Sequence, residues 1–243
     1  MSMENTRSSA SLPEELQPYL TPTAIIDSDH PAVREYARRA THGAADPVAA
    51  AVKLYLAVRD GIRYDPYAPF YLPEHYQASQ VIKRGRQFCV PKAALLCALA
   101  RAWAIPSRLG FANVKNHLAT RQLLEYLGTD LFVYHAFAEL YLNDRWVKAT
   151  PAFNRELCQR HKVPPLEFNG REDSLFQPYN QENQRYMEYV EFLETSADVP
   201  VAAIVSAFRR TYGEERVDHW IRLSEDRGGE SLSDFEGEEV WSD

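Results

Sequence analysis

The sequence predicts an α+β domain in which a helix that carries a cysteine packs on an antiparallel sheet. The helix is indicated by apolar residues that recur at helical spacing from residue 89 to residue 103. The sheet is indicated by side chains that alternate from residue 133 to residue 142. An Asn143-Asp144 turn and a second strand that ends at Thr150 complete a predicted hairpin. Further helices are expected at the N-terminal side and, as an extension, at the C-terminal side.

Composition and charge narrow the class of protein. The 243 residues suffice for one large domain with appendages, and 45% hydrophobic with 25% charged residues is typical of a soluble globular chain. The net charge of −7, without a Lys/Arg cluster, argues against a nucleic-acid partner. No segment resembles a membrane span, and the first residues lack the apolar region of a signal peptide. We therefore expect a cytoplasmic protein that binds neither nucleic acid nor membranes.

The sequence predicts that the chain divides into three parts. We expect a flexible N-terminal arm over residues 1–22 and a single domain with a C-terminal helical extension over residues 23–225. Residues 226–243 are expected to form an acidic mobile tail. Its last stretch, "GGESLSDFEGEEVWSD", has six acidic residues and no basic one, which is typical of a solvated segment.

The N-terminal part of the domain contains a helix followed by an aromatic loop. Residues 46–64 are expected to be helical, with Asp46 as the N-cap and Pro47 at the first helical position. Residues 65–76, "DPYAPFYLPEHY", have three prolines and many aromatic rings, which indicates a loop. This loop either walls a cleft or covers the core, and both alternatives remain open.

The C-terminal part contains one more irregular stretch and several helices. Residues 162–180 form a long segment with clustered prolines, which either walls the cleft or covers the domain. Helices are expected over residues 181–194, 200–212 and 214–224, and Gly213 separates the last two.

The three cysteines are expected to be free thiols. Their number is odd, and no CxxC spacing indicates a disulfide framework or a zinc site, so no metal or other cofactor is expected. Cys97 falls on the apolar face of the predicted helix and is assigned to the core. Cys158 has no evident partner.

Cys89 differs from the other two because it lies at the start of a helix. Pro91 belongs in a first helical turn, so Cys89 is placed at or just before the helix N-terminus. The unpaired N–H groups and the dipole there favour a thiolate, and the same groups can hold an oxyanion. Gln87 is a second candidate oxyanion donor because it lies nearby. The alternative is that Cys89 is a small core residue, as most free cysteines are.

His135 opens the first strand of the hairpin, and the turn length sets its neighbours. A two-residue loop places Glu139 opposite Lys148, an opposite-charge pair that favours this register. Thr150 then lies diagonal to His135, about 7 Å away between backbones, whereas Glu139 is roughly 13 Å along the strand. Thr150 or Asn154 is therefore the expected orienting residue. The alternative for His135 is an ordinary buried or surface histidine.

Together these segments resemble the transglutaminase-like superfamily of papain-type cysteine enzymes. The resemblance rests on "GRQFC" from Gly85, on "ALARAWAIPSRLGF", on the His-Ala strand and on "RWVKATP", and it covers about residues 45–155. These segments are most similar to those of a bacterial transglutaminase-like subgroup. It implies a papain/transglutaminase-like fold with Cys89 as nucleophile and His135 as general base. Thr150 occupies the position at which the family has an aspartate.

The resemblance implies thioester chemistry on an amide or ester bond of a peptide or a small molecule. Water as the acceptor gives a hydrolase or protease, and an amine gives an acyl transferase; the sequence leaves both open. The alternative function is a catalytically silent domain that binds a peptide or protein partner. The Cys89 and His135 pair favours the enzyme, and the uncharged Thr150 favours the silent domain, although a neutral residue serves this role in papain-like triads.

Overall fold

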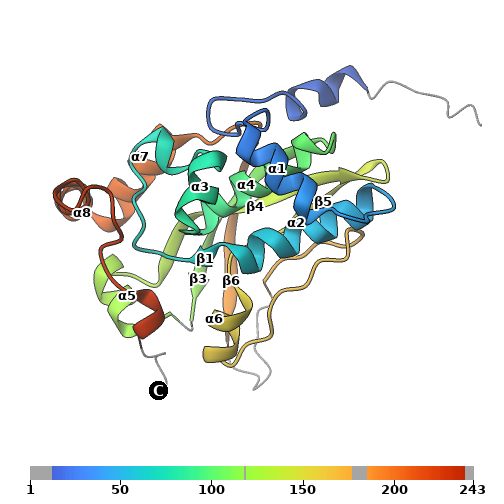
Figure 1. The fold of residues 1–243 in the computed structure, drawn as a ribbon. Helices are drawn as coiled ribbons and strands as arrows, with labels where there is room; N and C mark the ends of the chain where they lie inside the picture. The colour runs from blue at the N-terminus through green and yellow to red at the C-terminus, as the bar shows by residue number, and fades with distance from the viewer. Residues whose placement is uncertain (1–12, 118, 177–184, 239–243) are drawn as a thin grey trace, which may run out of the picture.

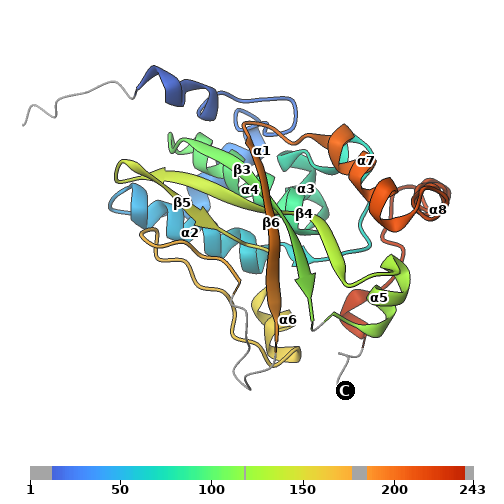
Figure 2. The same ribbon diagram turned by 180° about the vertical axis from the view of Figure 1, so that it is seen from behind.

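The computed structural model describes residues 13–117, 119–176 and 185–238, and its core is a four-stranded antiparallel sheet with the strand order β5-β4-β3-β6. The helices α1 to α4 lie together on one face of this sheet (Figure 1), and β6 and the opposite face are seen from behind (Figure 2). The predicted α+β class is confirmed. The sheet consists of β3 (Ser107–Asn116), β4 (Leu131–Leu142), β5 (Arg145–Ala149) and β6 (Met187–Ser196).

The helices precede, interrupt and follow the sheet. They are α1 (Pro31–Ala40), α2 (Pro47–Gly61), α3 (Ala78–Arg84), α4 (Cys89–Ala102), α5 (Arg121–Leu127), α6 (Arg155–Arg160), α7 (Val201–Tyr212) and α8 (Glu214–Asp226). Short elements complete the described part: the 3-10 turns η1 (Glu14–Tyr19), η2 (Pro73–His75) and η3 (Phe235–Gly237), and a parallel pair of two-residue strands, β1 (Arg63–Tyr64) and β2 (Arg86–Gln87).

The helix α4 is the central helix of the domain and begins at Cys89 as predicted. Every residue from Val90 to Arg101 is buried, and the helix packs on β4 and β3 and against α1, α2 and α3. Cys97 is fully buried, which confirms its assignment to the core. Because α4 is enclosed on all sides, its first turn is held firmly against the sheet.

The hairpin has the predicted turn and register. Asn143 and Asp144 have φ angles of 50° and 61°, as both central residues of a type I′ turn require. Glu139 pairs with Lys148 across β4 and β5, and their charged groups are 3.9 Å apart. The register derived from the turn length is therefore confirmed.

The C-terminal predictions are right for two helices and wrong for one segment. The helices α7 and α8 cover the expected residues and are separated by Gly213, whose φ of 95° few other residues tolerate. The helix predicted over 181–194 is wrong from residue 185 onward, because residues 185 and 186 are not helical and Met187–Ser196 is the edge strand β6, paired with β3. Residues 181–184 lie outside the described part.

The expected arm and the expected tail each contain a buried apolar side chain in their described parts. In the arm, Leu16 is buried and the Tyr19 ring meets the Trp146 ring at a centroid distance of 5.1 Å. In the expected tail, Phe235 is buried against Tyr64, at a centroid distance of 5.7 Å. Most other described residues of 13–22 and 226–238 are exposed or half-buried, so the expected arm and tail remain predictions. Residues 1–12 and 239–243 lie outside the described part.

The described helices include none that is both long enough and apolar enough to cross a bilayer.

Candidate active site

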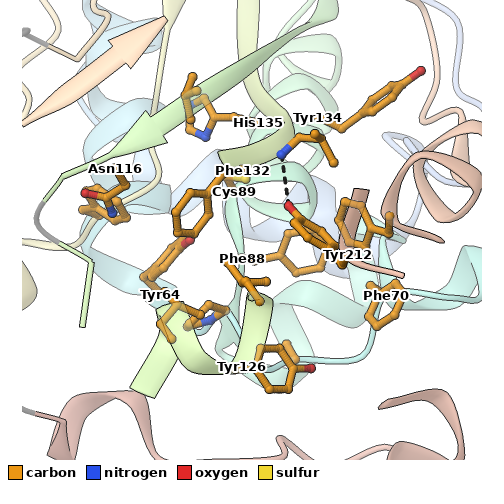
Figure 3. A pocket seen from close by; sticks show the side chains of 18 of the residues that line it. Tyr64, Phe70, Phe88, Cys89, Asn116, Tyr126, Phe132, Tyr134, His135 and Tyr212 are labelled. Atoms are coloured by element: carbon orange, nitrogen blue, oxygen red, sulfur yellow. Dashed lines mark hydrogen bonds between the residues drawn. The ribbon is translucent and has the colours of Figure 1, made fainter. Parts of the chain in front are cut away.

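Cys89 and His135 line the same pocket, as the sequence predicted they would. Cys89 enters it from the first residue of α4 and His135 from β4 (Figure 3). The free space of the pocket is about 750 Å³, counted out to its solvent-open mouth. The fold thus brings Cys89 and His135, which lie far apart in the sequence, to one pocket.

Backbone N–H groups surround the Cys89 sulfur. Burial raises the pKa of this thiol to about 11, whereas the N–H groups of Ala136, Val90 and Cys89 itself lower it. The Cys89 side chain is only half-buried, so a reagent that enters the pocket can reach it. The expectation of a thiolate at rest is therefore wrong, because the loss of water outweighs the helix N-terminus.

Burial also keeps the His135 ring neutral. It lowers the pKa of this imidazole to about 4. The rings of Phe176 and Tyr189 cover His135, at centroid distances of 5.5 Å and 6.3 Å. The pair at rest is therefore a thiol and a neutral imidazole, in which His135 is free to accept a proton.

The strand β4 contains a β-bulge immediately before His135. Asn113 of β3 lies opposite two residues of β4, Val133 and Tyr134, so the register of the two strands shifts at this point. Tyr134 has a φ of 55°, which a bulky residue rarely adopts. The extra residue changes the direction of β4 immediately before His135. The bulge therefore sets the position of the His135 side chain.

Two N–H groups at the bulge do not pair with the backbone of β3, and two side chains accept hydrogen bonds from them. The Tyr134 N–H donates to Oδ1 of Asn113 at 3.2 Å. The Val133 N–H donates to the hydroxyl of Tyr212, the last residue of α7, at 3.0 Å (Figure 3). Because a buried N–H group without a partner costs free energy, these two side chains stabilise the bulge.

Thr150 is buried at the end of the hairpin but forms no side-chain hydrogen bond in the described structure. Its hydroxyl and the Nε2 atom of His135 are both inaccessible to water and unpartnered. Tyr189 lies near both residues: burial raises the pKa of this phenol to about 12, and Thr150 lowers it in part. Thr150 thus forms no hydrogen bond to His135.

Asn154 and Gln87 do not have the roles predicted for them. Asn154 is the N-cap residue of α6, but its side chain bonds other groups: its Oδ1 accepts from the Tyr64 N–H at 3.1 Å and its amide donates to the Glu156 carboxylate at 3.0 Å. Gln87 is fully buried and donates to the His75 carbonyl at 3.0 Å. Neither residue lines the pocket of Cys89, so Asn154 does not orient His135 and Gln87 is no oxyanion donor.

The two proline-rich loops have different roles. Pro66 and Phe70 of the loop 65–76 line the pocket, so this loop forms part of its wall. Phe176, the last described residue of the segment 162–176, packs instead on His135 from behind, and this segment contributes no pocket residue in its described part. It is therefore a covering loop.

Sequence reasoning missed Asn113, Tyr212 and the N–H group of Ala136. A signal for Asn113 existed, since an amide side chain in the middle of a strand pattern is unusual and "FANVKN" contains one. Tyr212 had none, because its role depends on how α7 packs. Among the described residues, no group of His, Cys, Asp and Glu is arranged to hold a metal ion.

Residues 34–151 match the family model of the transglutaminase-like superfamily. This span contains Cys89, His135 and Thr150. This part of the chain is thus a transglutaminase-like domain, as the sequence motifs predicted.

A solved structure with a similar fold comes from Cytophaga hutchinsonii and is named a putative cysteine protease. The two chains are 16% identical with a TM-score of 0.50, over 81% of this chain and 52% of the other, so this chain spans about half the length of that protein. No curated protein matches this chain at a significant level. The domain family supports a cysteine-dependent enzyme in general terms, and the structural likeness supports its fold.

The bulge predicts the effect of replacing Asn113. In a Glu191→Gln background, which avoids a second carboxylate 3.0 Å from the Asn113 amide, Asn113→Ala removes the acceptor for the Tyr134 N–H and is expected to lower the free energy of unfolding by about 1 kcal/mol. Asn113→Asp keeps an acceptor oxygen in this background and loses less. Urea unfolding measures both. Equal losses in the two variants would contradict this role of the side-chain oxygen.

The neutral resting pair predicts how Cys89 reacts with iodoacetamide as a function of pH. Since the thiolate is the reactive form and burial raises the thiol pKa to about 11, the labelling rate should rise steadily from pH 6 to pH 9 without a plateau. Mass spectrometry of the Cys89 peptide follows the reaction, with N-acetylcysteine as reference. A plateau that begins below pH 7 would show a thiolate–imidazolium pair instead.

Proposed function

We propose that the protein is a cysteine-dependent hydrolase or acyl transferase that acts on an amide or ester bond. The observation that carries this proposal is the meeting of Cys89 and His135 in one pocket, with backbone N–H groups around the sulfur. A structural cysteine needs neither a base nor an open pocket. The family supports the general class, and the bond and the acceptor belong to the proposal.

In the first half-reaction, Cys89 attacks the carbonyl carbon of the substrate. Because the thiol is neutral at rest, its proton passes to the neutral ring of His135 as the C–S bond forms. Nε2 of His135 is buried, so Nδ1 is the nitrogen that exchanges protons with the pocket. The C–N or C–O bond then breaks, His135 returns the proton to the leaving amine or alcohol, and a Cys89 thioester remains.

The negative oxygen that forms during this attack is stabilised by backbone N–H groups. Cys89 and Val90 supply the free N–H groups of the first turn of α4, and Ala136 supplies one from β4. The residue after His135 therefore contributes to the same site as His135 itself. In the second half-reaction, water or an amine attacks the thioester, and His135 takes the proton of this acceptor.

The three free thiols support a reducing compartment, and the cytoplasm remains our proposal for the location. The partner is a small amide or ester or a peptide, and the chemistry described requires no cofactor.

Turnover of 4-nitrophenyl acetate and of 4-nitrophenyl phenylacetate tests the proposal, with and without hydroxylamine as acceptor. Cys89→Ala should reduce turnover to background, and His135→Ala should lower kcat/KM by about 100- to 10,000-fold, as loss of a general base does. Hydroxamate formation identifies acyl transfer, and acid release alone identifies hydrolysis. Cys158→Ala is the matched control, because this buried thiol is not in the pocket.

Wild-type turnover at background, or equal turnover in Cys89→Ala and wild type, would overturn the enzyme proposal. The first outcome would favour the silent binding domain, for which the specific observation is the uncharged and unbonded Thr150.

Thr150 is proposed to orient His135 once a substrate has entered. Thr150→Val keeps the shape and removes the hydroxyl, so we expect kcat to fall about tenfold, the cost of roughly 1.4 kcal/mol, with little change in KM. Steady-state kinetics separates the two constants. An unchanged kcat would show that another group orients the ring.

A further inference from the structure

The pocket that holds Cys89 and His135 has an uncharged lining. None of the described residues that line it is an aspartate, glutamate, lysine or arginine. Its polar lining consists of the catalytic pair, Asn116 and several tyrosines. By composition it resembles a binding site for an apolar ligand more than one for a charged ligand.

The titratable groups in this lining are also neutral near pH 7. Burial raises the pKa of the Cys89 thiol to about 11 and lowers the pKa of the His135 imidazole to about 4. Burial likewise raises the phenol pKa of Tyr64, Tyr126 and Tyr212 above the ordinary value. A charged group that entered would lose its water without gaining a counter-charge, which is strongly unfavourable.

Stacked aromatic rings form one wall of the pocket. The rings of Tyr126 and Trp220 stack at a centroid distance of 4.2 Å, with 16° between their planes. Phe70 packs on Phe208 at 5.2 Å and on Trp220 at 6.3 Å. Tyr212 is 5.9 Å from Trp220 and also bonds the β4 bulge. A planar apolar group packs favourably on such a surface.

This wall depends on the C-terminal extension. Phe208 and Tyr212 belong to α7 and Trp220 to α8, all beyond the span 34–151 that matches the family model. In Figure 1 the helices α7 and α8 lie at the end of the domain where α5 also lies. The catalytic pair thus comes from the family domain, whereas these three rings of the wall come from the extension.

The geometry points to a specificity pocket for a neutral aromatic acyl group, which lies on the rings of Tyr126, Phe208 and Trp220 while its carbonyl meets Cys89. This inference rests on the proposed function and names its substrate class. An acyl group with a carboxylate or an ammonium is excluded by the uncharged lining, and a small aliphatic group leaves the aromatic wall without contacts.

Three alkylating reagents with the same iodoacetyl group test this inference independently of turnover. They are N-benzyliodoacetamide, which is neutral and aromatic, iodoacetamide, which is neutral and small, and iodoacetate, which is charged. Each rate at Cys89, measured by mass spectrometry at pH 8, is divided by the rate of the same reagent with N-acetylcysteine. We expect the normalised rate of the benzyl reagent to exceed that of iodoacetamide about tenfold, and that of iodoacetate to be about tenfold lower.

Variants of the wall locate the preference. Trp220→Ala should lower the ratio of benzyl to unsubstituted reagent toward one. Phe208→Lys places a charge in the pocket at a half-buried position and should raise the normalised ratio of iodoacetate to iodoacetamide above one, whereas unfolding would bring this ratio only toward one. Trp146→Ala is the matched control, since this indole packs on Arg108 and Tyr141, outside the pocket, and should leave both ratios unchanged.

Normalised rates within threefold of one another for all three reagents, or a preference for iodoacetate, would overturn the inference. An aromatic preference that persists in Trp220→Ala would also overturn the inference, provided that circular dichroism shows this variant to be folded as the wild type is. The proposed function fails separately: alkylation needs only a reachable thiol, so an aromatic preference without Cys89-dependent turnover would leave a binding pocket and exclude the enzyme.

Discussion

The bulge in β4 is the constraint on which the rest of the site depends. A regular strand would continue past Asn113 with each residue in register, and the side chain of His135 would leave the sheet in another direction. The extra residue is held by two side-chain acceptors, Asn113 on the neighbouring strand and Tyr212 on α7. The position of the base therefore depends on the sheet and on the C-terminal extension together.

Burial sets the chemistry of the pair. The helix N-terminus favours a thiolate at Cys89, but the apolar pocket favours the neutral thiol more strongly, and it keeps His135 neutral as well. Proton transfer then has to accompany the attack on the carbonyl instead of preceding it. In the proposed reaction, the same lack of water and charge that disfavours the ion pair would favour a neutral aromatic substrate, so one physical cause accounts for the proposed reactivity and the proposed specificity.

Much of this site could be predicted from the sequence because the determining signals are local. Pro91 located the start of α4 at Cys89, and the two-residue turn fixed the register of the hairpin. The strand β6 was mistaken for a helix because glutamates and other helix-forming residues fill "QRYMEYVEFLE", and pairing with β3 overrides that preference. Gln87 was a candidate only because it is close to Cys89 in the sequence, and its amide donates instead to the carbonyl of His75. The acceptor of the Val133 N–H, Tyr212, lies far from the hairpin in the sequence.

The most direct test of the account is to identify the covalent intermediate. Wild-type protein is mixed with 4-nitrophenyl phenylacetate, quenched within the first turnover and digested for mass spectrometry. The account predicts a phenylacetyl group on Cys89 that forms more slowly in His135→Ala and is lost as turnover proceeds. Consumption of the ester without acylation of Cys89, or acylation of another residue instead, would contradict it.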